Sequence, residues 1–452
     1  MISISFTIML GLTVLIASTF STPISADIAD VPRKASSLSI SYCNGASYGW
    51  TWISGNKTIN ANGTYGIEGV PDIMNHPGGR VDSVSWIDIN GDFWLFGGTG
   101  YDESGGLGDL NDLWKFTINT KEWAWISGNK TINENGTYGM KGASDKVNYP
   151  GGRYGSASWT DKDGNLWLFG GYGYNESGSY GRLNDLWKFN IDSKEWVWVS
   201  GNKTINEHGI YGNKKVPNIA NYPGSREQSV SWTDINGDLW LFGGGGYDES
   251  GGLGWLNDLW RFNITSKEWA WMSGNETINA KGVYGTKGVS DVLNCPGARY
   301  YLVTWMDTDR NFCLFGGQGH DESGSLGYLN DLWKYNTTTN DWMWVSGNKT
   351  IDEHGIYGIK GVPNMTNYPG GRWSFVSWMD INENFWLFGG GGYAELGVAG
   401  SLNDLWAFNI ASKEWAWMSG NKTTGVYGIY GSKGVFNITN YPGGRGGSVS
   451  WT

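Results

Sequence analysis

The chain has 452 residues, among them 72 Gly, 29 Trp, 11 Pro, 3 Cys and 4 His. With 15% aromatic and only 17% charged residues, this composition excludes a coiled coil or a disordered acidic tail and favours strands joined by turns. The net charge of -11, with basic residues dispersed singly, argues against nucleic acid and anionic membrane surfaces as partners.

The N-terminal segment is predicted to be a signal peptide. Residues 1–20 carry no charge, and their apolar stretch, from about Phe6 to Ala17, is shorter than a membrane-spanning helix requires. A small-residue segment that ends at Ala26 follows it. We therefore expect cleavage near Ala26, a linker over residues 27–47, and a secreted mature protein that does not insert into a membrane.

A repeat of 73 residues fills the rest of the chain. Pro-Gly-x-Arg and Trp-x-Trp-x-Ser-Gly-Asn each occur six times, and Trp-Leu-Phe-Gly-Gly occurs at the same spacing, with Cys313 replacing its Trp in the fourth unit. The motif Asn-Asp-Leu-Trp begins at Asn111, Asn184, Asn257, Asn330 and Asn403.

Four short strands are predicted in each unit, over residues 80–87, 92–97, 110–118 and 122–127 of the first. The strand at 122–127 places Trp123 and Trp125 on one face. Asn90-Gly91 predicts a tight hairpin between the first two strands rather than a calcium loop, because the Gly is replaced in later units.

This pattern predicts an all-β fold, a β-propeller of four-stranded antiparallel blades over residues 48–452. Five blades are complete. A partial sixth takes its outermost strand from residues near 48–54 and its innermost strand from the end of the chain at Trp451, so we expect the native product to continue beyond Thr452. Five framework Trp per unit are expected to pack neighbouring blades together.

The double glycine Gly97-Gly98, followed by Phe116 and by Trp123 seven positions later, resembles the kelch repeat. All five units keep this spacing. The resemblance covers residues 48–452 and implies a propeller similar to kelch proteins and to the central domain of galactose oxidase. The unit is longer than the usual kelch repeat of about 50 residues, and we expect the excess to lie in loops.

Two long loops per unit are expected on one face of the propeller, over residues 99–109 and 128–152 in the first unit. Binding residues concentrate on such loops. The first loop carries acidic and aromatic residues that suit a glycan or a cation, although the same motif also suits a packed loop with solvated carboxylates. The candidate binding residues are Tyr101, Asp102, Glu103, Tyr174, Glu176, Tyr247, Asp248, Glu249, His320, Asp321, Glu322, Tyr393 and Glu395.

The arginine of Pro-Gly-x-Arg begins the innermost strand of each blade. It is expected either to line the channel mouth or to pair with the Asp of Asn-Asp-Leu-Trp. The six positions are Arg80, Arg153, Arg226, Arg299, Arg372 and Arg445.

No catalytic, metal or cofactor site is predicted. Carboxylate pairs recur in every unit, which favours a framework role, and the four His lie on different units. The copper ligands that a resemblance to galactose oxidase would require have no counterparts that can be assigned. Cys43, Cys295 and Cys313 allow one disulfide or three free thiols.

Thirteen Asn-x-Ser/Thr sequons are compatible with secretion, and six of them repeat one position. They are glycosylation candidates in a eukaryotic secretory pathway. Their positions are Asn56, Asn62, Asn129, Asn135, Asn175, Asn202, Asn263, Asn275, Asn336, Asn348, Asn364, Asn421 and Asn437.

The sequence thus predicts a secreted, non-enzymatic binding or adhesion module for a glycan or an extracellular protein. A carbohydrate-active or galactose-oxidase-like enzyme and a purely structural repeat protein are the alternatives.

Overall fold

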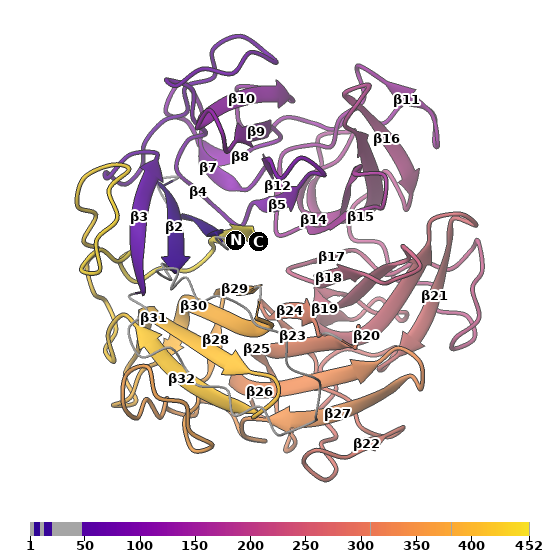
Figure 1. Cartoon of the computed structure of the whole chain (residues 1–452). Coiled ribbons are helices and arrows are strands. Elements are labelled where there is room, and N and C mark those ends of the chain that lie inside the picture. Colours follow the sequence, from indigo (N-terminus) through magenta and orange to yellow (C-terminus); the bar gives the residue numbers. More distant parts are fainter. Residues whose placement is uncertain (1–3, 10–12, 20–47, 308, 381, 452) are drawn as a thin grey trace, which may run out of the picture.

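The computed structural model describes residues 4–9, 13–19, 48–307, 309–380 and 382–451, and its regular elements are all β-strands. They form six antiparallel blades arranged in a circle around a common axis (Figure 1). The predicted β-propeller is therefore confirmed. Within the described ranges, no helix is long and apolar enough to cross a membrane. The predicted linker at 27–47, the cleavage position at Ala26 and Cys43 lie outside the described residues.

Each of the first five blades comes from one 73-residue unit. The first consists of β4 (Arg80–Val81), β5 (Val84–Ile87), β6 (Phe93–Phe96), β7 (Thr99–Tyr101), β8 (Leu107–Asp109), β9 (Leu113–Thr117) and β10 (Glu122–Ser127). The second consists of β11 (Ser144–Asp145), β12 (Arg153–Tyr154), β13 (Ala157–Thr160), β14 (Leu166–Tyr174), β15 (Tyr180–Asn190) and β16 (Glu195–Ser200). The third consists of β17 (Arg226–Glu227), β18 (Val230–Thr233), β19 (Leu239–Tyr247), β20 (Leu253–Asn263) and β21 (Glu268–Ser273).

The fourth and fifth blades repeat this plan. The fourth consists of β22 (Ser290–Asp291), β23 (Arg299–Tyr300), β24 (Val303–Met306), β25 (Phe312–His320), β26 (Leu326–Asn336) and β27 (Asp341–Ser346). The fifth consists of β28 (Arg372–Trp373), β29 (Val376–Met379), β30 (Asn384–Tyr393), β31 (Ala399–Asn409) and β32 (Glu414–Ser419).

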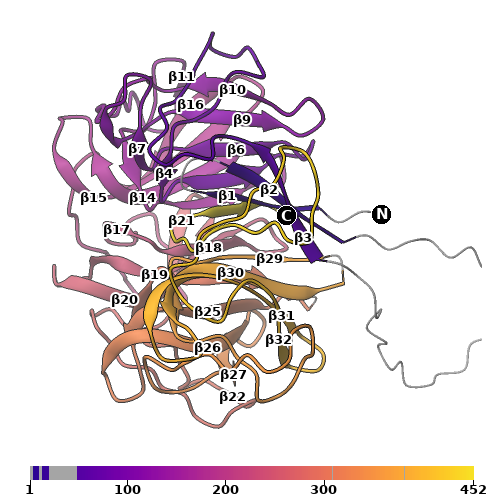
Figure 2. The same cartoon turned by 90° about the vertical axis from the view of Figure 1, so that its left-hand side faces the viewer.

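The sixth blade joins the two ends of the chain, as expected. Its sheet has the order β3 (Tyr48–Ser54), β2 (Thr13–Thr19), β1 (Ile4–Met9) and β33 (Val449–Trp451). These strands lie together in both views (Figure 1 and Figure 2). The sequence predicted only the outer and inner strands, because β1 and β2 carry none of the repeat motifs and fall in the segment expected to be a signal peptide. The signal peptide stays a prediction.

The framework Trp residues pack between blades. In the first unit Trp86, Trp94, Trp114 and Trp123 are at most 3% exposed, and the Trp86 indole donates a hydrogen bond to the carbonyl of Trp167 in the next blade (3.1 Å). Burying one aromatic side chain contributes up to about 4 to 6 kcal/mol. Most of the Trp content is therefore accounted for by the frame.

The two segments expected as long loops are largely ordered against the blades. In the first blade β7 pairs with β8, so residues 99–109 form a hairpin rather than an open loop. The segment 128–152 includes β11, which pairs with the outermost strand β16 of the second blade, and β22 pairs with β27 in the same way. The excess length of the unit thus extends one hairpin and covers the outer edge of each blade.

Candidate functional site: the propeller axis

The predicted Tyr-Asp-Glu segments form tight turns whose acidic residues have structural partners. Asp102 is buried, and its Oδ1 accepts hydrogen bonds from the backbone of Ser104 and Gly106 and from the Ser104 hydroxyl. Asp248 and Asp321 close equivalent turns. These aspartates hold the hairpin ends in shape.

The glutamates of the same turns lie at the surface, Glu395 half-buried and the others exposed, and are held by neighbouring groups. Glu176 pairs with Lys203 at 3.0 Å, and the Lys203 ammonium also lies 5.2 Å from the centre of the Trp198 ring. Lysines lie in the same way beside Glu103, Glu322 and Glu395, at 3.8, 3.0 and 2.9 Å, and Glu249 accepts a hydrogen bond from the backbone of Tyr211.

The aromatic members pack against neighbours. Tyr174 contacts Tyr180, His320 contacts Trp255, and Tyr393 contacts Tyr328 and His354. Tyr101 and Tyr247 are half-buried. The structure therefore shows packed turns with solvated, paired carboxylates.

Five of the six candidate arginines form buried ion pairs with the Asp of Asn-Asp-Leu-Trp, which is the second of the two predicted alternatives. Arg153 donates two hydrogen bonds to Asp185, at 2.7 and 2.9 Å, and a third to the carbonyl of Gly170. The same carboxylate accepts hydrogen bonds from the Tyr138 hydroxyl and the Trp187 indole. The corresponding pairs are Arg80–Asp112, Arg226–Asp258, Arg299–Asp331 and Arg372–Asp404.

These pairs fix the frame and do not line the channel. Both partners of each pair have side chains that are at most 2% exposed. Burial and the adjacent Asp185 raise the pKa of Tyr138 well above its usual value, so this hydroxyl stays protonated and keeps donating its hydrogen bond. Arg445 of the sixth blade is also buried, but it donates to the Gly443 carbonyl at 3.0 Å and the Tyr430 hydroxyl at 3.4 Å instead of a carboxylate, and burial lowers its pKa.

Cysteine and metal chemistry find no site in the described part of the chain. Cys295 and Cys313 are free thiols, and burial raises the pKa of both, that of Cys295 to about 12. Within the described ranges, no group of three His, Cys, Asp or Glu side chains is placed to hold a metal ion.

The sequons differ in accessibility. Asn175 is buried and its side chain closes a turn, so it is not accessible to a glycan in the folded protein. The exposed sequon asparagines are Asn56, Asn62, Asn135, Asn275, Asn364 and Asn437. The half-buried ones are Asn129, Asn202, Asn263, Asn336, Asn348 and Asn421.

The innermost strands meet in a closed ring of backbone hydrogen bonds around the axis. The residue two positions after each Pro-Gly-x-Arg arginine has a positive φ, between 54° and 66°, and donates its N–H to the carbonyl of the same position in the preceding blade, at 2.6 to 3.4 Å. We call these six residues the axial ring. They are Asp82, Gly155, Gln228, Tyr301, Ser374 and Gly447.

The axial ring varies in chemistry although the frame around it repeats. Arg, Asn-Asp-Leu-Trp and the double glycine recur from blade to blade, whereas the ring holds an acid, an amide, a phenol, a hydroxyl and two glycines. A positive φ strains any residue other than glycine by about 1 to 3 kcal/mol, yet four ring positions carry a side chain. Thirteen other non-glycine residues of the described chain also have a positive φ, so the variety of side chains around the axis, rather than the strain, distinguishes the ring.

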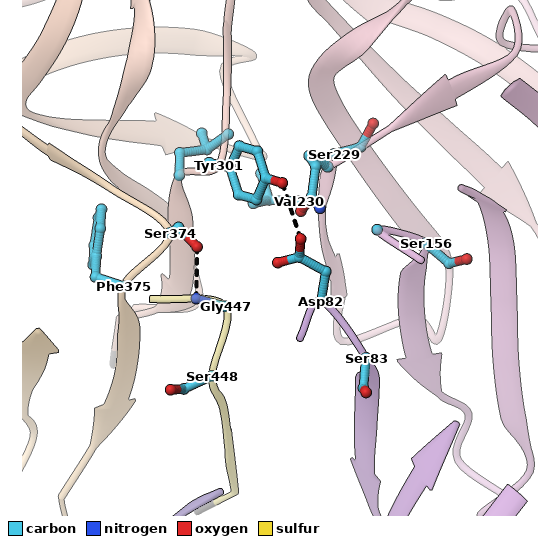
Figure 3. A pocket seen from close by; sticks show the side chains of 13 residues that line it. Asp82, Ser83, Ser156, Ser229, Val230, Tyr301, Ser374, Phe375, Gly447 and Ser448 are labelled. Carbon is cyan, nitrogen blue, oxygen red and sulfur yellow. Dashed lines mark hydrogen bonds between the residues drawn. The ribbon is translucent and has the colours of Figure 1, made fainter. Parts of the chain in front are cut away.

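The ring borders a cavity of about 150 Å³ on the axis (Figure 3). On one side Ser83, Ser156 and Ser229 donate their hydroxyl hydrogen bonds to carbonyls of double glycines. In the fourth and fifth blades Leu302 and Phe375 take the same place and give the cavity an apolar side. The cavity is therefore polar on one flank and apolar on the other.

Asp82 supplies the cavity with a carboxylate. The Tyr301 hydroxyl donates a hydrogen bond to its Oδ2 across the axis (3.0 Å, Figure 3). Asp82 is half-buried, and its partial burial raises its pKa to about 6, with the Tyr301 hydrogen bond opposing the effect and the Glu227 charge adding to it. Near neutral pH the carboxylate is charged, and no Lys, Arg or His among the described residues forms an ion pair with it.

Two groups of side chains adjoin the cavity, and they reach its lining through Asp82 and Tyr301. The acidic sector comprises Asp82, Asp109, Glu227 and Arg182, in which Arg182 pairs with Glu227 at 2.7 Å. Burial raises the pKa of Glu227 and of Asp109. Tyr154 lies near these acids, and burial together with their charges raises its pKa.

The aromatic sector comes from the third to fifth blades. Tyr301 contacts Tyr300 and Trp373, with ring centres 4.8 and 5.1 Å apart. Trp255 stacks on Tyr300 at 5.7 Å, and Tyr328 stacks on Trp373 at 6.3 Å. All five rings are half-buried, so each keeps part of its surface open to solvent.

Sequence reasoning missed the axial site, because it sought function in residues that repeat. The available signal was the opposite one, a position of changing residue type two places after a motif that does not change.

Neither a known family model nor a curated protein matches the chain.

Proposed function

We propose that the protein is an extracellular, kelch-type binding module that holds a glycan at the axial site. The observation that carries the proposal is the variation of the axial ring within a repeated frame. Aromatic faces, carboxylates and an amide beside a cavity suit a sugar, because its C–H face packs on aromatic rings and its hydroxyls donate to acidic oxygens. The exposed sequons support an extracellular location.

Glycan binding is tested by a glycan array followed by calorimetry with the best ligand. Trp373→Ala removes an aromatic face of the site without touching the buried framework Trp. We expect about five- to thirtyfold weaker binding, since such contacts contribute about 1 to 2 kcal/mol. Tyr427→Ala is the matched control, because Tyr427 is 92% exposed and lies outside the axial site.

A silent array, or a Trp373→Ala variant with unchanged affinity, would contradict glycan binding at the axis. Silence in the array together with normal folding would favour the structural-protein alternative.

One observation favours an enzyme as the second candidate. Asp82 and Glu227 both have pKa values raised by burial, and carbohydrate-cleaving enzymes use one protonated and one ionised carboxylate. Incubation of the array's best ligand with the protein would then release new reducing ends, and Asp82→Asn would abolish the release. If the ligand stayed intact after long incubation, the enzyme candidate would be refuted and only the binding function would remain.

A further inference from the structure

We propose that the ligand group held in the axial cavity is a protonated primary amine on a sugar ring, so that the protein selects amino sugars with free amines over their N-acetylated or neutral counterparts. This inference rests on the proposed glycan-binding function and names its substrate class.

The first argument is charge. The acidic sector contains three carboxylates and one cation, and the Arg182 guanidinium is already paired with Glu227. The Asp109 carboxylate accepts hydrogen bonds from the hydroxyls of Thr99 and Tyr180, at 2.6 and 2.8 Å. Asp82 has its hydrogen bond from Tyr301 and no ion pair within the described chain. The Asp82 carboxylate, which lines the cavity, thus lacks a protein cation within the described chain, and a ligand cation would neutralise it.

The second argument is the state of the aromatic rings. Lysine ammonium groups lie over the repeated Trp rings at the outer edges of the blades. The Lys214 ammonium lies 4.1 Å from the Trp271 ring centre and the Lys422 ammonium 5.2 Å from that of Trp417. In the aromatic sector no described Lys or Arg lies over Tyr300, Tyr301 or Trp373. Open aromatic faces next to an unpaired carboxylate match a cation that also carries an apolar surface.

The third argument is the donor and acceptor content of the cavity. Ser448 lines it, and its Oγ is buried without a hydrogen-bond partner in the described chain. A buried hydroxyl of this kind costs free energy until a partner binds. An ammonium group donates three hydrogen bonds, and the Asp82 carboxylate in the cavity lining accepts them. The N-acetyl group offers one N–H, no charge and greater bulk, so it should bind more weakly.

The test compares three probes on the purified protein by calorimetry at pH 7, where Asp82 is ionised. The probes are a glucosamine tetrasaccharide, its fully N-acetylated form and a β-linked glucose tetrasaccharide. We expect the free-amine tetrasaccharide to bind at least tenfold more tightly than either of the others. A charge-assisted hydrogen bond supports a difference of that size.

Asp82→Asn removes the charge while keeping shape, and Asn tolerates the left-handed backbone that this position requires. We expect the variant to bind all three probes with similar affinity, and its folding is checked by tryptophan fluorescence. Asp163→Asn is the control, because Asp163 is exposed on the hairpin turn between β13 and β14, outside the cavity lining. It should keep the preference of the wild type.

Several outcomes would overturn the inference. Equal binding of amine and N-acetylated probes by the wild type would refute amine selection while leaving glycan binding intact, and so would a preference that survives in Asp82→Asn. Tighter binding of a trilysine peptide than of the glucosamine probe would assign the site to protein side chains instead. Failure of all three sugars to bind would refute the proposed function itself.

Discussion

Replacing Asp82 by Asn should stabilise the protein at neutral and alkaline pH. The pKa of Asp82 is about 6 in the folded protein, against an ordinary value of 3.8. The folded state therefore binds this proton more tightly than the unfolded state, and stability is lost as pH rises from about 4 to above 6. A shift of about 2 units corresponds to about 3 kcal/mol at 1.36 kcal/mol per unit. The Asn variant lacks this loss.

Urea unfolding followed by tryptophan fluorescence measures the effect, with wild type and variant compared at pH 4 and pH 8. The free energy of unfolding of the variant minus that of the wild type should be about 2 to 3 kcal/mol larger at pH 8 than at pH 4. Comparing two pH values cancels differences between Asn and Asp that do not depend on charge. Glu227 also titrates with a raised pKa, but it does so in both proteins. Equal differences at the two pH values would refute the account of Asp82 as a charge buried for a ligand.

Three further changes test the frame and the strain on the axis. Arg226→Ala should lower the free energy of unfolding by about 3 to 5 kcal/mol, because it leaves the buried Asp258 carboxylate uncompensated. Arg445→Ala, which breaks no ion pair among the described residues, should lower it much less. Equal losses in urea unfolding would contradict this reasoning. Cys295 and Cys313 should resist iodoacetamide at pH 8 in the native protein, because burial keeps both thiols protonated, and should react in denaturing urea. Peptide mass spectrometry follows the labelling, and rapid labelling of the native protein would show that burial does not suppress the thiolates. Gln228→Gly should raise the free energy of unfolding by up to about 1 kcal/mol, because φ is 54° there; a loss in urea unfolding would mean that the Gln228 side chain stabilises the fold.

Repetition made the frame predictable. The spacing of Trp123 and Trp125 placed the outer strand at residues 122–127, and the structure has β10 over the same residues. The Arg–Asp pairing was one of two predicted alternatives, because spacing alone does not show whether a guanidinium at a strand start faces the channel or the sheet. Residues 99–109 were expected to be a loop because they are rich in Gly and acids, but Asp102 closes a short turn and lets the strands on either side pair.

The axial site was not predictable in the same way. Gly155 and Gly447 hint at a left-handed backbone two residues after the arginine, whereas Asp82 and Tyr301 at the equivalent positions do not. The six ring positions follow the repeat at intervals of 73 residues, but only the inter-blade hydrogen bonds show that these residues form one closed ring. A position defined by backbone conformation carries little signal in residue type.

The closed ring on the axis separates architecture from recognition. Its six hydrogen bonds use only N–H and C=O groups, so any residue that tolerates a left-handed conformation can occupy a ring position without breaking the closure. The identities of the six residues can then change while the backbone scaffold stays constant. A library randomised at these positions alone would keep the Arg–Asp pairs and the Trp packing, which makes the molecule a starting point for selecting new small-ligand binders.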